Sequence, residues 1–235
     1  MTRMTSRAPL DASAGWTVVL PVKGGPGAKS RLGHPARADL AGAVALDTVA
    51  AVLACPRVSR VLVVTADGRV AADHAALGAI VVVDPGGGLA GALTAGANAA
   101  RTVAGRTVAA RIVADVEVVG WPGPCALLLA DLPSLRPEDV SVVLDACERL
   151  LGAGARQVTV PDADGTGTVL LAAGSASALR PRFGPGSAAA HAAEALVVPG
   201  APVRMRRDVD TAEHLADAVR LGVGPRTAAV LAATG

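Results

Sequence analysis

One carboxylate stands where an apolar run of the chain stops. Residues 125–130 (CALLLA) form a short continuous apolar run, which is typical of a strand buried on both faces of a parallel sheet. Asp131 follows this run directly, and Pro133 then takes the chain out of the sheet. Ligands of open α/β sheets bind just outside the carboxyl ends of the strands, where a carboxylate can hold Mg²⁺ against substrate phosphates. The alternative role, capping of the next helix, is less favoured because residues 137–139 (PED) already form a helix start.

A basic, glycine-rich loop is the second candidate, and it follows an apolar run at residues 16–22. The loop contains both lysines of the chain, Lys23 and Lys29, together with Gly24 and Arg31. Glycines let backbone amides approach a phosphate closely, and the three cations add positive charge. The spacing matches neither GxxxxGK[ST] nor GxGxxG. An ordinary strand-to-helix loop is the alternative, but three cations directly after a buried strand favour anion binding.

Further turns combine glycines, hydroxyls and carboxylates. Residues 84–88 (DPGGG) open a predicted helix, and a helix amino terminus after glycines is an anion or nucleotide site. In residues 162–168 (DADGTGT), hydroxyls and bare amides can hold an oxyanion. This loop begins like an EF-hand, but no matching glutamate follows, which argues against calcium. Ser187 is predicted to be a helix N-cap, either a plain cap or one whose amides face an anion.

Composition excludes several classes of protein. The formal net charge is +2 and aromatic residues make up 1%, so neither bulk charge nor stacking platforms indicate nucleic acid binding. The three cysteines, at positions 55, 125 and 147, lie in apolar contexts and indicate reduced core residues of a cytoplasmic protein. No apolar stretch approaches the length of about 18 residues that a membrane helix needs. Residues 1–14 lack the apolar segment of a signal peptide, and we expect a disordered leader there.

Periodicity places these candidates on alternating strands and helices. The alternation predicts βαβ crossovers and a mainly parallel sheet in one domain, residues 15–235. Residues 105–123 are predicted to be an insertion or surface excursion, and residues 222–235 a tail. The predicted strands are residues 16–22, 60–65, 79–83, 125–130, 156–160, 168–172 and 202–207, and the predicted helices are residues 36–54, 70–77, 89–104, 137–151, 187–195 and 211–221.

Taken together, the motifs resemble a known family. They run in the order VLPVKGGPGAKSRL, DPGGGLAGAL, LLLADLPSL, PDADGTGTVLL, RFGPGSAAAH and RRDVDTAEHL. This set resembles the guanylyltransferases that make the phosphodiester precursor of coenzyme F-420, over nearly the whole chain. The resemblance implies a single Rossmann-like three-layer αβα nucleotidyltransferase domain of glycosyltransferase-A type, with a mainly parallel mixed sheet. It also implies transfer of GMP from GTP to phosphoenolpyruvate, with release of diphosphate.

The resemblance further implies roles for particular residues. Phosphoenolpyruvate contacts fall on Thr168, Gly184 and Ser187, and the carboxylates for Mg²⁺ fall on Asp131 and Asp208, with Asp210 nearby. The GTP-binding set comprises Lys23, Gly24, Lys29, Arg31 and Gly88, and Lys29 joins Asp131 and Asp208 in catalysis. The chain departs from the family at Ala90, where many members have an asparagine that can reach the nucleotide, and in its longer excursion at residues 105–123.

Several alternatives stay open from sequence. The acceptor could equally be 2-phospho-L-lactate or 3-phosphoglycerate, because each presents a phosphate beside a carboxylate. A molybdenum-cofactor guanylyltransferase or a sugar-phosphate cytidylyltransferase shares the fold and the aspartate at the strand end, although the GTGT and FGPGS motifs argue against both. A catalytically silent nucleotide-binding protein is the non-enzymatic alternative. The oligomeric state is also open, with a homodimer as one arrangement.

Overall fold

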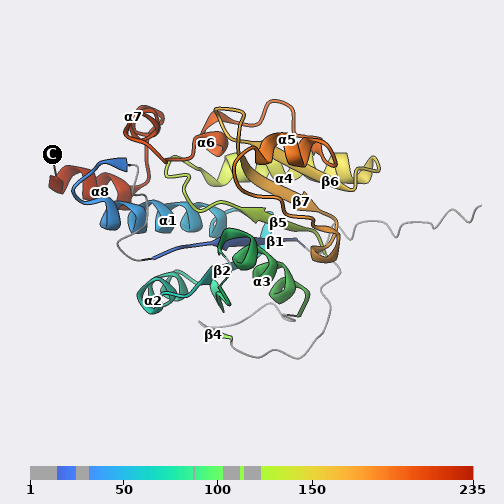
Figure 1. The fold of residues 1–235 in the computed structure, drawn as a ribbon, viewed down its shortest axis with the longest axis horizontal. Coiled ribbons are helices and arrows are strands. Elements are labelled where there is room, and N and C mark those ends of the chain that lie inside the picture. Colours follow the sequence, from blue (N-terminus) through green and yellow to red (C-terminus); the bar gives the residue numbers. More distant parts are fainter. Residues whose placement is uncertain (1–14, 25–31, 87, 103–111, 114–122, 235) are drawn as a thin grey trace, which may run out of the picture.

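A single mixed sheet organises the part of the chain that the structure describes. The computed structural model describes residues 15–24, 32–86, 88–102, 112–113 and 123–234 (Figure 1). Within them, the eight strands of the sheet lie in the order β4 (Ile112–Val113), β3 (Ile80–Val83), β2 (Val58–Thr65), β1 (Trp16–Pro21), β5 (Cys125–Leu128), β7 (Thr168–Ala173), β6 (Gln157–Pro161) and β8 (Leu196–Val197). The first five strands are parallel to one another, whereas β7 is antiparallel to both β5 and β6.

Helices cover both faces of this sheet, which gives three layers. One face of β1, carrying Val18 and Leu20, packs in a core with helices α1 (Arg37–Leu53) and α4 (Pro137–Gly152). Val19 points to the other face, where α3 (Gly88–Thr102) packs. Figure 1 shows α1 and α3 on opposite sides of β1. The strands are therefore apolar on both faces, as parallel strands between two helix layers must be. The predicted mixed, mainly parallel α/β architecture is confirmed.

A glycine lets α3 lie close to the sheet. A Cβ atom at Gly96 would come within 2.1 Å of Val19 Cγ1 and 2.8 Å of Val64 Cγ2. No side chain fits in that space, so the helix backbone itself contacts the two valines. This close approach fixes α3, whose amino terminus begins at Gly88, against β1 and β2.

The carboxyl-terminal residues form a helix rather than the predicted tail. Helix α8 (Pro225–Thr234) packs against α1, and the Asp47 carboxylate accepts the backbone N–H of Thr227 at 2.8 Å and that of Arg226 at 3.2 Å. A Cβ atom at Gly224 would overlap this carboxylate. The sequence prediction is wrong here because the group that satisfies the helix amino terminus comes from a helix far away in the chain.

Three other sequence predictions need correction or extension. Residues 202–207 are not a strand, because α6 (Val203–Arg206) is a short helix that buries Met205. The helix predicted at residues 187–195 is shorter, α5 (Ser187–Ala192), and it is followed by the unpredicted strand β8.

The other described elements are the helices α2 (Gly68–Ala76) and α7 (Ala212–Leu221) and the 3-10 turn Ala176–Ala178.

Some predictions cannot be compared with this structure. The leader, residues 1–14, lies outside the described residues, and so does most of the excursion, of which the structure describes β4 and Gly123. The division into a leader and one domain stays a prediction.

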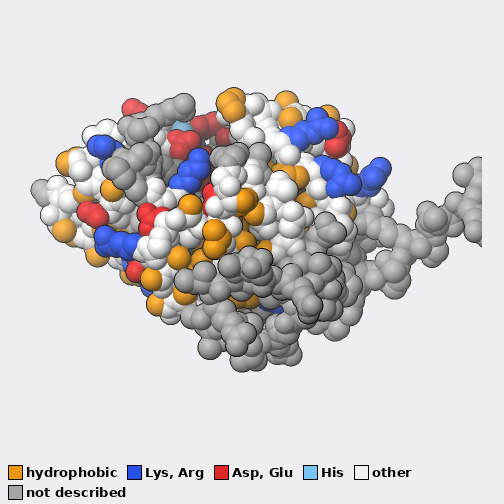
Figure 2. Space-filling view, turned by 60° about the horizontal axis from the view of Figure 1, so that its bottom comes forward, with side chains coloured by type: hydrophobic (Ala, Val, Ile, Leu, Met, Phe, Trp, Pro, Cys, Tyr) orange, Lys and Arg blue, Asp and Glu red, His pale blue; other side chains and the backbone are white. Residues whose placement is uncertain are grey.

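The three cysteines are buried and unpaired, as predicted. Burial raises the pKa of Cys125 and of Cys147 to about 12, so both are thiols at neutral pH. None of the helices in the described part of the chain combines the length and apolar character needed to cross a membrane. On the face drawn in Figure 2, acidic and basic side chains are interspersed, and no area of a single sign dominates.

Candidate active site

The two principal candidate aspartates are brought together by the backbone. Asp131 lies three residues beyond the end of β5, at the carboxyl edge of the parallel strands. Its carbonyl oxygen accepts the backbone N–H of Val209 at 3.0 Å, so the segment that carries Asp208 runs beside it. Asp131 is half-buried, and Asp208 is 8% exposed. Asp208 follows α6, a short helix, and not the strand predicted at residues 202–207.

Buried hydroxyls hold the turn that follows Asp131. The Thr48 hydroxyl on α1 accepts the backbone N–H of Leu132 at 3.1 Å and donates to the Val44 carbonyl at 2.8 Å. Ser134 Oγ donates to the Ala218 carbonyl of α7 at 2.8 Å. The chain around Asp131 is thus fixed to two helices. Neither residue was singled out in the sequence, because a buried hydroxyl on a helix carries no recognisable motif.

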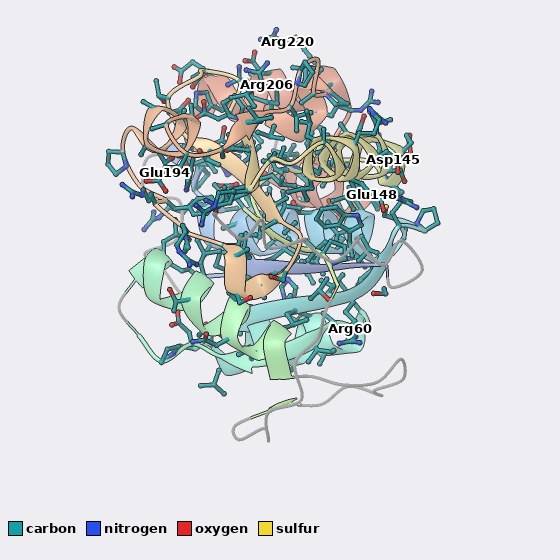
Figure 3. All side chains as sticks on the ribbon, turned by 90° about the vertical axis from the view of Figure 1, so that its right-hand side faces the viewer. Arg60, Asp145, Glu148, Glu194, Arg206 and Arg220 are labelled. Carbon is teal, nitrogen blue, oxygen red and sulfur yellow. The ribbon has the colours of Figure 1, made fainter. Side chains whose placement is uncertain are left out.

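Two arginines of α6 fix the segment that carries Asp208. Arg204 donates two hydrogen bonds to the Asp139 carboxylate, at 2.8 and 3.0 Å, and Asp139 also accepts the backbone N–H of Arg136 at the start of α4. Arg206, labelled in Figure 3, donates to the carbonyls of Pro161 and Asp162. A bidentate arginine–carboxylate pair has a defined orientation, so α6 places Asp208 relative to α4 and β6.

Asp162 shapes the loop between β6 and β7. Its carboxylate accepts the backbone N–H of Thr166 at 2.9 Å and that of Gly167 at 2.6 Å. A Cβ atom at Gly167 would lie 2.4 Å from the same carboxylate, which explains the glycine. Asp162 is therefore a loop-organising residue, and its position leads directly to Thr168 at the start of β7.

A second set of contacts links this loop to the segment after Asp208. His214 Nδ1 accepts the backbone N–H of Asp210 at 3.4 Å, and its Nε2 lies 3.1 Å from the Asp164 carboxylate. Arg207 pairs with the same carboxylate at 3.0 Å. Asp210 thus lies on a stretch of backbone fixed to the acidic loop, close to Asp208 in sequence.

The GTGT and FGPGS motifs meet at one histidine. Thr168 Oγ1 lies 2.9 Å from His191 Nδ1, and the backbone N–H of Arg182 donates to His191 Nε2 at 2.8 Å. The Phe183 ring packs edge-on against the imidazole, with centroids 5.0 Å apart. A further backbone bond joins Ala188 to the Thr166 carbonyl at 3.2 Å. The two motifs predicted to bind one acceptor therefore lie side by side.

The FGPGS segment itself differs from prediction at its end. Ser187 is the first residue of α5 rather than its N-cap, and the N-cap position belongs to Gly186 with φ 73°. Gly184 has φ 135°, a backbone conformation that residues other than glycine rarely adopt. Ser187 is buried beside Gly184, whose carbonyl accepts its backbone N–H at 3.1 Å.

The structure describes only part of the basic loop. Lys29 and Arg31 lie outside the described residues. Lys23 is exposed just beyond β1, which neighbours β5 in parallel with Val19 opposite Leu127. Lys23 and Asp131 therefore follow adjacent strands at the same edge of the sheet. Gly24 passes so close to Asp67, the N-cap of α2, that a Cβ atom would overlap its carboxylate.

The donor set suits Mg²⁺. Among the described residues, no group of three or more His, Cys, Asp or Glu side chains is arranged to hold a metal. Magnesium, however, is commonly bound through one or two carboxylates and completed by substrate phosphates and water. Asp131 and Asp208, placed side by side by the Val209 hydrogen bond, match that mode with oxygen ligands only.

Comparison with known proteins identifies close relatives. The chain is 49% identical over 220 residues to the phosphoenolpyruvate guanylyltransferase of Salinispora arenicola, covering 91% of this chain and 92% of the relative. It is 46% identical over 224 residues to the phosphoenolpyruvate guanylyltransferase of Streptomyces coelicolor, covering 92% and 96%. No protein-family model matches the chain. A solved structure of CMP:2-keto-3-deoxy-manno-octonic acid synthetase with CTP aligns over 88% of this chain and 98% of that one, with a TM-score of 0.48 and 15% identity.

Proposed function

Since this chain belongs to the phosphoenolpyruvate guanylyltransferase family, we propose that it transfers GMP from GTP to phosphoenolpyruvate. The products are enolpyruvyl-2-diphospho-5'-guanosine and diphosphate. The geometric observation that supports the proposal is the Val209–Asp131 backbone hydrogen bond, which joins the segments that carry Asp131 and Asp208 at the carboxyl edge of the sheet. That edge is where open α/β sheets bind their ligands.

Asp131 and Asp208 would hold Mg²⁺, with Asp210 nearby. The ion, when bound, neutralises phosphate charge during an in-line displacement. The role of the protein is to fix the segments that carry the carboxylates. Thr48 of α1 holds the chain after Asp131, and Arg204 and Arg206 of α6 hold the segment of Asp208 to α4 and β6. This rigid support favours a site that aligns two phosphates over one that merely captures a nucleotide.

The acceptor site of the proposal comprises Thr168, Gly184 and Ser187. These residues come from two separate motifs, and the contacts through His191 bring the motifs together. Thr168 is 2% exposed, so a hydrogen bond from its hydroxyl to an anion would be largely shielded from water. A small phosphorylated acid, which carries a charged group at each end, can bind between these two polar loops.

The GTP site of the proposal lies at the ends of β1 and β3. Lys23 and Gly24 follow β1, and Gly88 begins α3 after the 84–88 turn. Lys29 and Arg31 complete the basic loop in sequence. Cations at this position would stabilise the negative charge that develops on the departing diphosphate.

The chemistry requires few protein groups. A phosphate oxygen of phosphoenolpyruvate attacks the α-phosphorus of GTP, the bond from that phosphorus to the bridging oxygen of the β-phosphate breaks, and diphosphate leaves. The nucleophile is already anionic, so no protein general base is needed. Positioning and charge neutralisation carry the catalysis. We place the reaction in coenzyme F-420 biosynthesis, because the motif resemblance implies that pathway, and in the cytoplasm; the oligomeric state stays open, with a homodimer as one arrangement.

Product analysis tests the proposal. Purified protein is incubated with GTP, Mg²⁺ and one acceptor at a time, and the products are identified by mass spectrometry. Formation of the enolpyruvyl product with phosphoenolpyruvate supports it. Product with 2-phospho-L-lactate or 3-phosphoglycerate alone would reassign the acceptor, and product with a molybdenum-cofactor precursor would reassign the enzyme. GTP binding without product from any acceptor would favour a silent nucleotide-binding protein.

A further inference from the structure

A buried histidine without an assigned role links the two acceptor motifs. His191 is 2% exposed and lies on α5, four residues after Ser187. Both of its ring nitrogens have partners. Nε2 accepts the backbone N–H of Arg182 at 2.8 Å, and Nδ1 lies 2.9 Å from the Thr168 hydroxyl.

These two contacts determine where the imidazole proton sits. A backbone amide can only donate, so Nε2 must be unprotonated to accept from Arg182. The proton of the neutral ring is then on Nδ1, which lies 2.9 Å from Thr168 Oγ1 and therefore cannot accept from that hydroxyl; the Ser187 backbone, one turn earlier in α5, also interacts with the ring. Burial lowers the pKa of His191, and the nearby Arg182 guanidinium lowers it further, so the neutral ring is the dominant form at neutral pH.

This tautomer determines the direction of the Thr168 hydroxyl. Because the protonated Nδ1 cannot accept from Oγ1, the hydroxyl hydrogen is directed away from the imidazole. Among the described residues, Thr168 Oγ1 has no second hydrogen-bond partner. The Thr168 hydroxyl is therefore oriented to donate a hydrogen bond, which is what an anionic acceptor substrate requires.

We propose that His191 is a positioning residue for the acceptor: it orients the Thr168 hydroxyl as a hydrogen-bond donor. This inference rests on the proposed function. The ring also fixes the spacing between the two motifs, because its two nitrogens contact one motif each and the Phe183 ring packs on it. Glu194, labelled in Figure 3, pairs with the Arg182 side chain at 2.5 Å and so holds the segment that carries Arg182 from its exposed side.

Substitutions that separate the two hydrogen bonds test the inference. In His191→Asn the amide nitrogen can replace Nδ1 as a donor to Thr168, whereas His191→Gln can replace only the acceptor for Arg182, and His191→Leu replaces neither. We expect His191→Leu and His191→Gln to raise the phosphoenolpyruvate KM about tenfold or more, with the GTP KM within about twofold. His191→Asn should stay within about threefold of wild type.

A second buried histidine provides the matched control. His74 is also 2% exposed, and its Nδ1 contacts the Val70 carbonyl within its own helix. His74→Leu removes the same volume and polarity elsewhere in the fold. It should lower thermal stability without changing the phosphoenolpyruvate KM. An unchanged phosphoenolpyruvate KM in His191→Leu, or equal losses in His191→Asn and His191→Leu, would overturn the inference.

A spectroscopic measurement keeps the inference separate from the proposed function. Nitrogen-15 NMR of the wild-type imidazole should show a protonated Nδ1 on His191, and Thr168→Ala should shift that resonance. A protonated Nε2 would overturn the inference whatever the enzyme does, and it also decides the case if His191→Leu does not fold. Failure of the wild type to guanylylate any acceptor would reject the proposed function, while the tautomer would still show whether His191 orients Thr168.

Discussion

The hydroxyl of Thr48, in the middle of α1, accepts the backbone N–H of Leu132, the residue that follows Asp131. Thr48 is fully buried and donates in turn to the Val44 carbonyl of its own helix. One helical side chain therefore fixes the direction in which the chain leaves β5. The position of the Asp131 carboxylate depends on this contact, although Thr48 itself touches no candidate ligand group.

Thr48→Val should weaken both the fold and the reaction. The valine leaves the Leu132 N–H buried without its partner, which costs about 1–3 kcal/mol of unfolding free energy. We also expect kcat to fall about tenfold or more, because small displacements of reacting groups have large effects on rate. Urea unfolding and steady-state kinetics measure the two effects. Thr48→Ser, which keeps the hydroxyl, is the control, and equal kinetics in the two variants would contradict the positioning role.

Asp131→Asn should abolish guanylyl transfer while the protein stays folded. Loss of a carboxylate that holds Mg²⁺ removes several kcal/mol of transition-state stabilisation. Turnover is measured with GTP and phosphoenolpyruvate, and circular dichroism verifies the fold. Asp145→Asn changes a partly exposed acid of α4 that pairs with Arg57, and it should retain wild-type activity. Near-normal turnover by folded Asp131→Asn protein would remove Asp131 from the metal site.

Thr168→Val should weaken acceptor binding and leave GTP binding nearly unchanged. The lost hydrogen bond to a charged group is worth about 1.5–3 kcal/mol, which corresponds to at least about a tenfold rise in the phosphoenolpyruvate KM. Kinetics with each substrate varied in turn measure this, and Thr168→Ser is the matched control. A GTP KM that rises while the acceptor KM stays constant would assign the loop to the nucleotide.

Lys29→Ala should lower kcat/KM for GTP by about tenfold or more and lower kcat as well. The reason is that an interaction with the departing diphosphate strengthens as the transition state is reached. The phosphoenolpyruvate KM should change little. Arg149→Ala removes an exposed cation in the last turn of α4 and serves as the control. If Lys29→Ala raised only the acceptor KM, the basic loop would belong to the acceptor.

Stability should fall as the pH drops just below about 6.5, the usual pKa of histidine. Burial is the main cause of the lowered pKa of His191, and Arg182 adds to it while Glu194 opposes it. The strands that contact α5, β6 and β7, carry no ionisable side chains. Just below that pH the unfolded chain binds more protons than the folded one, so stability rises with pH and is lost as pH falls.

Urea unfolding on both sides of that pH measures the effect. His191→Leu should show a weaker loss of stability on acidification than wild type. His74→Leu retains His191 and therefore keeps the contribution of His191 to the pH dependence of stability. Burial also lowers the pKa of His74, so this variant removes a separate contribution of the same sign. An identical pH dependence in wild type and His191→Leu would show that His191 does not change its protonation on unfolding.

Elements whose determinants lie within a few neighbouring residues were predicted correctly from the sequence. The presence of β5 and the start of α4 were predictable because a continuous apolar run and a Pro-Glu-Asp start are each contained in a few residues, although β5 ends at Leu128 and not at residue 130. Residues 202–207 were predicted wrongly because Arg204 is held by Asp139, 65 residues earlier, and no local pattern records that pair. The acceptor motifs were recognisable as sequences, but His191, which joins them, has no ligand spacing in the sequence that would indicate its two contacts.

The connection between Arg206 and the loop at residues 162–168 constrains how such an enzyme can diverge. The Arg206 carbonyl accepts the backbone N–H of Ala163 at 2.8 Å, while its guanidinium binds the carbonyl of Asp162 at 2.8 Å. Asp208 and Thr168 are thus carried by two pieces of chain that must shift together. A lineage that changed its acceptor by reshaping this loop would also move a carboxylate proposed to hold the metal. New substrate preference in these proteins should therefore arise through changes of side chains at the acceptor site, with the loop backbone conserved in shape.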